Sequence, residues 1–141
     1  MKVLTVDDNL IIRKIVANSL RPFDCDVLEA GDGAQGLSVT AEQKPDLIIL
    51  DVMMPVMDGV TMLAQLKERP ESKDIPVIML TAQSGQELLS KIARMGNSSG
   101  YLAKPFSKDQ LLEKIRSIVP LQPNPTWRIR PAVNYFQHAS G

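Results

Sequence analysis

The segment LIILDVMMPVMDG, residues 47–59, gives the clearest indication of how this chain folds. Its first four residues are apolar without alternation, which is typical of a strand covered on both faces in the middle of a parallel sheet. The apolar run ends at Asp51, and Pro55 and Gly59 follow, as expected for a loop between a strand and a helix. A buried strand that ends in a carboxylate raises the question of which other charged groups the fold brings to the same place.

Four other short apolar segments have the length and composition of strands. We expect strands at residues 2–6, in CDVLEA around Val27, at residues 76–80 and in GYLAK at residues 100–104. Longer segments with apolar residues at helical spacing alternate with these strands, and each of the five strands is followed by one. The chain therefore reads as five consecutive βα units.

The helices are expected at residues 9–20, from the turn at residues 31–33 to about residue 43, from residue 59 to about residue 70, at 86–95 and at 107–119. Asn9 and Ser107 are suitable N-caps for the first and the last of them. The apolar residues expected at helical spacing on the inner faces are Ile12, Ile15, Val16, Leu20, Leu37, Ala41, Val60, Leu63, Leu66, Leu88, Leu89, Ile92, Leu111, Leu112, Ile115, Ile118 and Val119.

Strict alternation of strands and helices predicts an α/β fold, a flavodoxin-like, doubly wound (βα)5 domain. Its five-stranded parallel sheet should have the order 2-1-3-4-5, with helices on both faces, because a barrel would need eight units. We expect this domain to span residues 1–120. Residues 121–141 contain three prolines and the only tryptophan, and they read as a C-terminal tail or linker.

Composition excludes several classes of function. A chain of 141 residues with 44% hydrophobic and 23% charged residues is ordinary for one globular domain. The 16 basic and 16 acidic residues cancel, so bulk charge predicts neither direct nucleic-acid binding nor attraction to anionic membranes. No segment approaches the ~20 apolar residues of a membrane span, and the opening residues reach Asp7 and Asp8 too soon for a signal peptide. With one cysteine, Cys25, the chain is expected to be cytoplasmic and that thiol to be buried.

Five polar residues stand where the predicted strands end: Asp7, Asp8, Asp51, Thr81 and Lys104. Alone, each has an ordinary structural explanation, such as helix capping or a solvated charge. In open α/β sheets, however, ligands bind at the carboxyl ends of the strands, beside the first strand. The joint placement of all five residues at this edge therefore favours a functional site.

Three clustered carboxylates are stable together only with a cation or with raised pKa values. Oxygen ligands of this kind suit Mg²⁺, with Mn²⁺ as a second possibility. An aspartate beside such an ion can attack a phosphoryl group and hold it as an aspartyl-phosphate. We therefore expect Asp51 to be the nucleophile and Asp7 and Asp8 to hold the metal, while Lys104 and Thr81 stabilise the transferring oxygens.

Four motifs in order carry a family resemblance: VDDN at residues 6–9, LDVMMPVMDG at 50–59, MLTAQ at 79–83 and YLAKPF at 101–106. Together they resemble the CheY-like receiver domain of the response regulators of two-component signal transduction. The resemblance runs from about Lys2 to Val119, so the domain at residues 1–120 is expected to be a receiver domain.

The resemblance implies a signalling phosphoacceptor rather than an enzyme, limited to self-catalysed phosphotransfer and autodephosphorylation. Asp51 would accept the phosphoryl group from a sensor histidine kinase or a histidine phosphotransfer protein. Asp8, Asp51 and the backbone carbonyl of Met53 would bind Mg²⁺ directly, and Asp7 would act largely through a metal-bound water.

The resemblance also implies a conformational switch. Lys104 would contact the phosphoryl oxygens, Thr81 would move towards them, and Tyr101 would change rotamer. The surface formed by the fourth helix, fifth strand and fifth helix would then control a downstream target protein, or an output domain absent from this sequence. The stretch MGNSSGYLAK departs from the usual receiver pattern at Asn97, Ser98 and Ser99, in the loop before the fifth strand.

Three alternatives remain on the residues alone. A receiver that docks partners without phosphorylation is the first. An aspartyl-phosphate phosphohydrolase of the haloacid dehalogenase type needs a second aspartate where Met53 stands. A flavodoxin would need serine, threonine and glycine where the chain has Asp7, Asp8 and Asn9.

Two further expectations concern residues next to the site. The apolar side chain of Met53 cannot orient an attacking water, so we expect a longer phosphoryl lifetime than in receivers with a polar residue at this position. We also expect a cis peptide bond at Lys104–Pro105 that aims the lysine.

Overall fold

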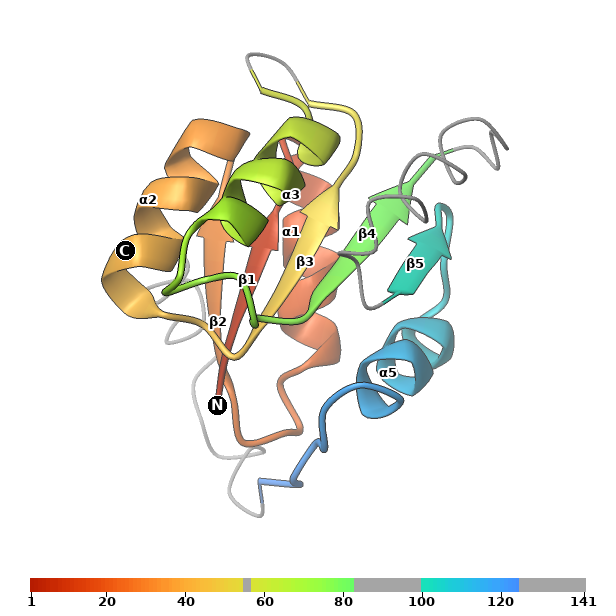
Figure 1. Cartoon of the computed structure of the whole chain (residues 1–141). Helices are drawn as coiled ribbons and strands as arrows, with labels where there is room; N and C mark the ends of the chain where they lie inside the picture. Colours follow the sequence, from red (N-terminus) through yellow and green to blue (C-terminus); the bar gives the residue numbers. More distant parts are fainter. Residues whose placement is uncertain (55–56, 83–99, 125–141) are drawn as a thin grey trace.

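The computed structural model of the chain describes residues 1–54, 57–82 and 100–124 (Figure 1). The strands are β1 (Lys2–Val6), β2 (Asp26–Ala30), β3 (Leu47–Asp51), β4 (Val77–Thr81) and β5 (Gly100–Ala103). The helices are α1 (Leu10–Ser19), α2 (Gly33–Gln43), α3 (Gly59–Glu68) and α5 (Lys108–Arg116). The helix that the sequence predicts at residues 86–95 lies outside the described residues.

The five strands form one parallel sheet with the order β2-β1-β3-β4-β5, which confirms the predicted topology. The chain starts in the middle of the sheet, moves to one edge with β2, and then crosses β1 to build the other half. This reversal places the ends of β1 and β3 side by side, with Val6 opposite Leu50. In doubly wound folds that edge is where ligands bind.

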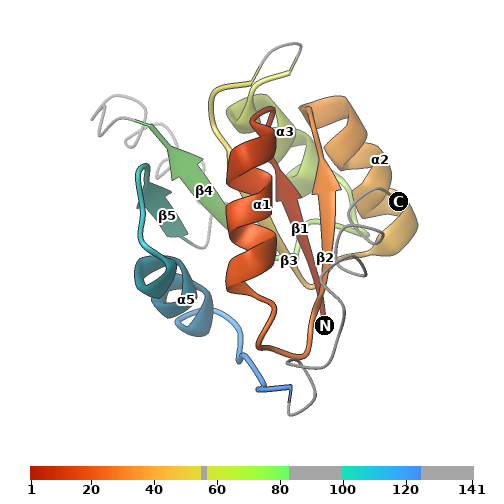
Figure 2. The ribbon, with the colours of Figure 1, turned by 180° about the vertical axis from the view of Figure 1, so that it is seen from behind.

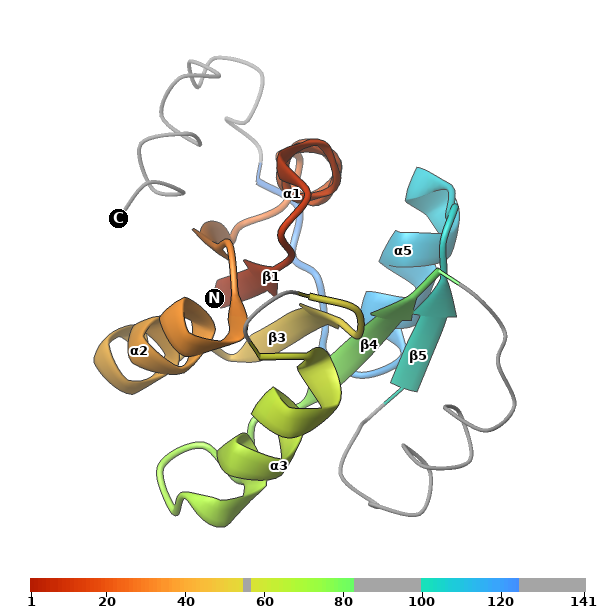
Figure 3. The same cartoon turned by 90° about the horizontal axis from the view of Figure 1, so that it is seen from above.

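Helices cover both faces of the sheet (Figures 2 and 3). One apolar cluster joins α2 and α3 to the even-numbered side chains of β1, with Leu37 and Met62 among its members. The second cluster joins α1 and α5 to the opposite face through residues such as Val16 and Leu111. Every residue of β3 and β4 is buried, as their continuous apolar sequences predict.

The capping residues confirm the predicted helix starts. The side chain of Asn9 accepts hydrogen bonds from the backbone N–H groups of Ile11 and Ile12 at the start of α1. At the start of α5, Ser107 and Gln110 form a reciprocal capping box. Such caps satisfy backbone N–H groups that have no partner within the helix.

Two predicted inward-facing residues lie at the surface instead. Ile15 is 40% exposed, because α1 packs on the sheet through Val16, Ala17 and Leu20, and Ile15 falls on the outer side of that face. Ala41 is exposed as well, since the buried positions of α2 are Gly33, Gly36, Leu37 and Thr40. At the end of α5 the helix stops at Arg116, and Ile118 and Val119 pack against the core from beyond it.

The described chain continues past α5 along the end of the sheet. Leu121 packs against the α1–α5 cluster, and residues 122–124 then pair with the loop between α1 and β2. The backbone N–H of Asp24 donates to the carbonyl of Gln122 at 2.7 Å, and that of Asn124 donates to the carbonyl of Pro22 at 2.8 Å. Phe23 and Pro123 thereby form an antiparallel bridge.

Candidate functional site

Lys104 connects two carboxylates at the carboxyl edge of the sheet. Its Nζ donates to Asp7 Oδ2 at 2.9 Å and to Asp51 Oδ1 at 3.1 Å. Asp7 follows β1 and Asp51 ends β3, and both residues are buried. Three segments that are far apart in the sequence therefore meet at one ammonium group.

Asp8 completes a cluster of three carboxylates. One oxygen from each of Asp7, Asp8 and Asp51 lies within 4.8 Å of the other two. Asp8 is exposed, whereas Asp7 and Asp51 are buried, so the cluster opens to solvent on the Asp8 side. Three hard oxygen donors with one open side are a donor set that fits Mg²⁺, which keeps several of its own waters.

Burial and neighbouring charges shift the pKa values of Asp51 and Lys104. Burial and the neighbouring charge of Asp7 raise the pKa of Asp51, against the lowering effect of Lys104 and of a backbone hydrogen bond from Met53. Burial alone would lower the pKa of Lys104, but the hydrogen bonds and charges of Asp7 and Asp51 raise it overall. Lys104 therefore stays protonated at neutral pH.

Backbone contacts hold this edge of the sheet in place. The N–H of Lys104 donates to the carbonyl of Thr81 at 2.7 Å, and that of Gly59 donates to the carbonyl of Val52 at 2.8 Å. A Cβ atom added at Gly59 would collide with the carbonyl oxygen of Asp51 and lie 2.9 Å from its carbonyl carbon. Only glycine lets α3 start this close to the end of β3, which explains the glycine at that position.

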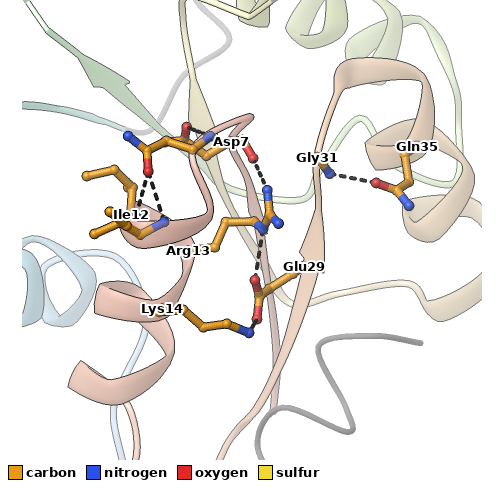
Figure 4. A network of polar contacts seen from close by, with 9 residues as sticks. Asp7, Ile12, Arg13, Lys14, Glu29, Gly31 and Gln35 are labelled. Atoms are coloured by element: carbon orange, nitrogen blue, oxygen red, sulfur yellow. Dashed lines mark hydrogen bonds and ion pairs between the residues drawn. The ribbon is translucent and has the colours of Figure 1, made fainter.

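A polar network between α1 and β2 supports Asp7 from behind (Figure 4). Arg13 Nη1 donates to the backbone carbonyl of Asp7 at 2.6 Å, and its Nε donates to Glu29 Oε1 at 2.8 Å. Lys14 reaches the other carboxylate oxygen of Glu29 at 3.2 Å. Sequence reasoning missed this network, although an arginine and a lysine opposite a glutamate inside a predicted strand were a usable signal.

The remaining predicted site residues lie at or near the same edge. Thr81 is buried at the end of β4, opposite Ala103 and next to the turn that carries Lys104. The side chain of Met53 is 67% exposed beside Asp51. Tyr101 on β5 is 51% exposed and so lies at the surface, opposite Met79 of β4.

The peptide bond between Lys104 and Pro105 is cis, as the sequence predicts. Cys25 is a buried free thiol, also as predicted. Within residues 1–54, 57–82 and 100–124, no helix has the length and apolar character of a transmembrane span.

Comparison with known proteins identifies the class that this fold and site define. Residues 3–116 match the response regulator receiver domain family. The chain belongs to this family, which confirms the resemblance found in the four sequence motifs. Receiver domains are signalling domains of two-component systems rather than enzymes, and they generally bind Mg²⁺ at an acidic pocket.

Individual relatives come from several bacteria. Protein PilG of Pseudomonas aeruginosa is 39% identical over 120 residues, which cover 85% of this chain and 88% of PilG. The probable chemotaxis protein CheY of Rhizobium etli is 34% identical over 84% of this chain and 92% of its own. The DNA-binding dual master transcriptional regulator RpaA of Synechocystis is 36% identical, and there the chain spans 48% of the relative's length.

A solved structure agrees with the fold. Chemotaxis response regulator CheY4 of Vibrio cholerae superposes with a TM-score of 0.78 and 33% identity. The match covers 84% of this chain and 98% of that one. The similarity therefore extends over the whole βα domain and does not depend on one motif.

Proposed function

We propose that this chain is a phosphoacceptor receiver in which Asp51 accepts a phosphoryl group from a phosphohistidine. The observation that carries the proposal is the contact of one lysine, Lys104, with two buried carboxylates beside a third. Three carboxylates beside one ammonium group leave uncompensated negative charge, which is costly for a purely structural ion pair. The same arrangement is suited to hold a metal ion and a transferring phosphoryl group.

In the proposed reaction an oxygen of the Asp51 carboxylate attacks the phosphorus of the phosphohistidine. The phosphorus–nitrogen bond breaks, a phosphorus–oxygen bond forms, and the departing imidazole nitrogen takes up a proton. Asp51 is suited to this role because β3 delivers it from the buried centre of the sheet to the edge. Lys104, already beside Asp51, would turn its charge towards the phosphoryl oxygens.

We assign Asp8 and Asp51 as the direct ligands of Mg²⁺, joined by the backbone carbonyl of Met53; Mn²⁺ would fit the same donors. When bound, the ion supplies positive charge that offsets the developing negative charge on the phosphoryl oxygens. Asp7 already accepts hydrogen bonds from Lys104 at one oxygen and from the backbone of Asn9 at the other. This pairing supports an indirect role for Asp7, through a water on the ion.

We further propose that Thr81 and Tyr101 form the switch and that residues 1–120 are the receiver domain. Phosphorylation adds about −1.5 to −2 charges and three strong acceptor oxygens. The hydroxyl of Thr81 would be drawn towards them, and Tyr101 would leave its exposed position. The resulting surface on β5 and α5 would shift the population of states that a downstream partner recognises. The fourth helix of the proposed surface lies outside the described residues.

The partners proposed are a sensor histidine kinase or a histidine phosphotransfer protein upstream, and a target protein or an output domain downstream. RpaA is a DNA-binding transcriptional regulator, but the chain spans only about half of that protein's length. We do not assign nucleic-acid binding to this chain, in keeping with its balanced charge. The cytoplasm is the proposed compartment, a reducing environment in which the free thiol of Cys25 would persist.

The test is the intact mass of the protein after incubation with acetyl phosphate and Mg²⁺. We expect an added mass of about 80 Da, one phosphoryl group. Asp51→Asn or EDTA should abolish the adduct. Asp24→Asn, which changes an exposed carboxylate away from the site, should leave it intact. An adduct that persists in Asp51→Asn would place the phosphoryl group elsewhere, and no adduct in any sample would favour a receiver that docks without phosphorylation.

A further inference from the structure

Helix α1 exposes large apolar side chains on its outer surface. Leu10 is 53% exposed, Ile11 69% and Ile15 40%. Among residues 1–54, 57–82 and 100–124, six large apolar residues are exposed, and three of the six belong to this one helix. Ile11 and Ile15 are one helical turn apart and so share a face. We call Leu10, Ile11 and Ile15 the α1 face, a patch of the kind that is usually covered by a partner.

The described chain ends beside the lower end of this helix. Residues 122–124 are held by two backbone hydrogen bonds to the loop that follows α1, at Pro22 and Asp24. Arg116 lies over the ring of Phe23, 5.3 Å from its centre, and adds a second contact between α5 and the same loop. Figure 2 shows the segment after α5 running under the C-terminal end of α1. The chain after Asn124 therefore starts next to α1.

The sequence beyond Asn124 has an apolar residue at every second position. In the stretch TWRIRPAVNY, residues 126–135, the apolar or proline positions are Trp127, Ile129, Pro131, Val133 and Tyr135. Polar residues or alanine fill the positions between them. In an extended chain, such alternation puts all the apolar side chains on one side and the two arginines on the other. A segment of this kind needs an apolar surface to cover.

We propose that residues 125–135 of this chain dock on the α1 face, so that their apolar side chains, Trp127 and Ile129 among them, cover this patch. The reach is sufficient. Ile11 lies about 12 Å from Ser19 along the helix axis at 1.5 Å per residue, and residues 125–133 span up to about 30 Å when extended. Because the segment is attached at Asn124, its local concentration at the face is high, and a modest apolar contact is enough to keep it bound.

The α1 face begins next to the acidic cluster. The upper end of the α1 face begins at Leu10, directly after Asn9 and the exposed Asp8. A segment docked there would therefore lie next to the acidic cluster. The docking itself does not depend on the proposed phosphoryl chemistry, so either can fail without the other.

Trp127 is the only tryptophan in the chain, which makes its fluorescence a direct probe of the docking. The experiment measures its emission maximum and its quenching by acrylamide in the full chain. We expect a blue-shifted emission and a quenching constant about threefold below that of a free tryptophan derivative, because a docked indole is shielded on one side. The double substitution Ile11→Ser and Ile15→Ser should return both values to those of the free derivative.

Two further variants separate docking from loss of structure. Tyr101→Ser removes another large exposed side chain. Its neighbour Leu102 packs with the α1–α5 cluster. Because successive residues of a strand point to opposite faces, Tyr101 lies on the face of the sheet away from α1. It should leave the fluorescence unchanged. Ile129→Asn changes the proposed docking segment and leaves residues 1–124 unaltered. It should expose Trp127 as the α1 double variant does, with the urea midpoint of the domain unchanged.

Three results would overturn the proposal. If acrylamide quenches Trp127 as strongly as it quenches the free tryptophan derivative, the segment does not dock. Shielding that survives the Ile11→Ser and Ile15→Ser pair would place the segment on another surface. Shielding that disappears on dilution would assign the α1 face to a second copy of the chain.

Discussion

The clearest quantitative expectation concerns the charge of Asp51 in the metal-free protein. Oxygens of Asp7 and Asp8 lie within 4.8 Å of an Asp51 oxygen, while Lys104 Nζ lies 3.1 Å from it. At an effective dielectric constant of about 20, each carboxylate repels Asp51 by about 3.5 kcal/mol and the ammonium attracts it by about 5 kcal/mol. The two repulsions together exceed the attraction by about 2 kcal/mol before screening of the exposed Asp8. Burial is the first cause of the raised pKa of Asp51 and adds to the cost of its charge. The ionised Asp51 is therefore a net cost to the folded state.

Asp51→Asn removes that charge with little change in shape. We expect the variant to be more stable than the parent by about 1–3 kcal/mol, once the screening of the exposed Asp8 is allowed for. The measurement is urea unfolding of both proteins at pH 7, in EDTA and at low ionic strength. Asp24→Asn is the matched control, an exposed aspartate for which we expect a change within ~0.5 kcal/mol.

The pH dependence follows from the direction of the pKa shift. Because the pKa of Asp51 is raised above its ordinary value of 3.8, the folded state holds this proton more tightly than the unfolded state does. The cost of ionised Asp51 is therefore absent below pH 3.8 and reaches its full size above the raised folded pKa. The stability advantage of Asp51→Asn should shrink as the pH is lowered through that window.

Magnesium should act in the opposite direction. An ion that binds the folded cluster at about tenfold its Kd adds about 1.4 kcal/mol to the parent, and Asp51→Asn should gain less because it has lost a ligand charge. A variant less stable than the parent in EDTA would refute the electrostatic reasoning. Equal Mg²⁺ stabilisation of the two proteins would refute the place of Asp51 among the ligands.

Three other substitutions test separate parts of the structure. Gly59→Ala should lower the free energy of unfolding by about 1–3 kcal/mol in urea unfolding, because the new Cβ meets the Asp51 carbonyl group; a neutral result would mean that α3 can shift. Ser107→Ala removes the hydrogen bond from the Gln110 backbone N–H to the Ser107 hydroxyl, which is one half of the capping box, and should cost about 1 kcal/mol by the same measurement. An unchanged midpoint would count against the cap. If Asp51 is phosphorylated, Met53→Asn should shorten the lifetime of the phosphoryl group, because an amide can orient an attacking water and the exposed thioether side chain of Met53 cannot. The lifetime is measured as the decay of the added mass. A fast decay that the substitution leaves unchanged would count against this role.

Much of the fold was predictable because buried residues recur at regular short intervals along a strand or a helix. The continuous apolar runs at residues 47–50 and 76–80 already indicated a two-sided parallel sheet, and alternation with helices then restricted the topology. The same logic located the site, since parallel strands end at one edge. The buried faces of the helices were predicted less accurately than the strands. Ile15 and Ala41 fitted the period yet are exposed, because a stripe of apolar residues is wider than the contact that a helix makes with a sheet.

The order of strands and helices along the chain was enough to show which residues could meet: an acidic pair after the first strand, Asp51 at the end of the third, and Thr81 and Lys104 after the last two. How these residues pair depends on contacts that form only when the chain folds. Lys104 lies 97 residues from Asp7 and 53 from Asp51, and no local period specifies that its ammonium group bonds to both. The ion pair that fixes Arg13 against Glu29 of β2, and the backbone hydrogen bonds of residues 122–124 to the loop after α1, are likewise contacts that no local period specifies. Periodicity encodes which side of an element is buried, whereas the partners on that side depend on how the elements pack together.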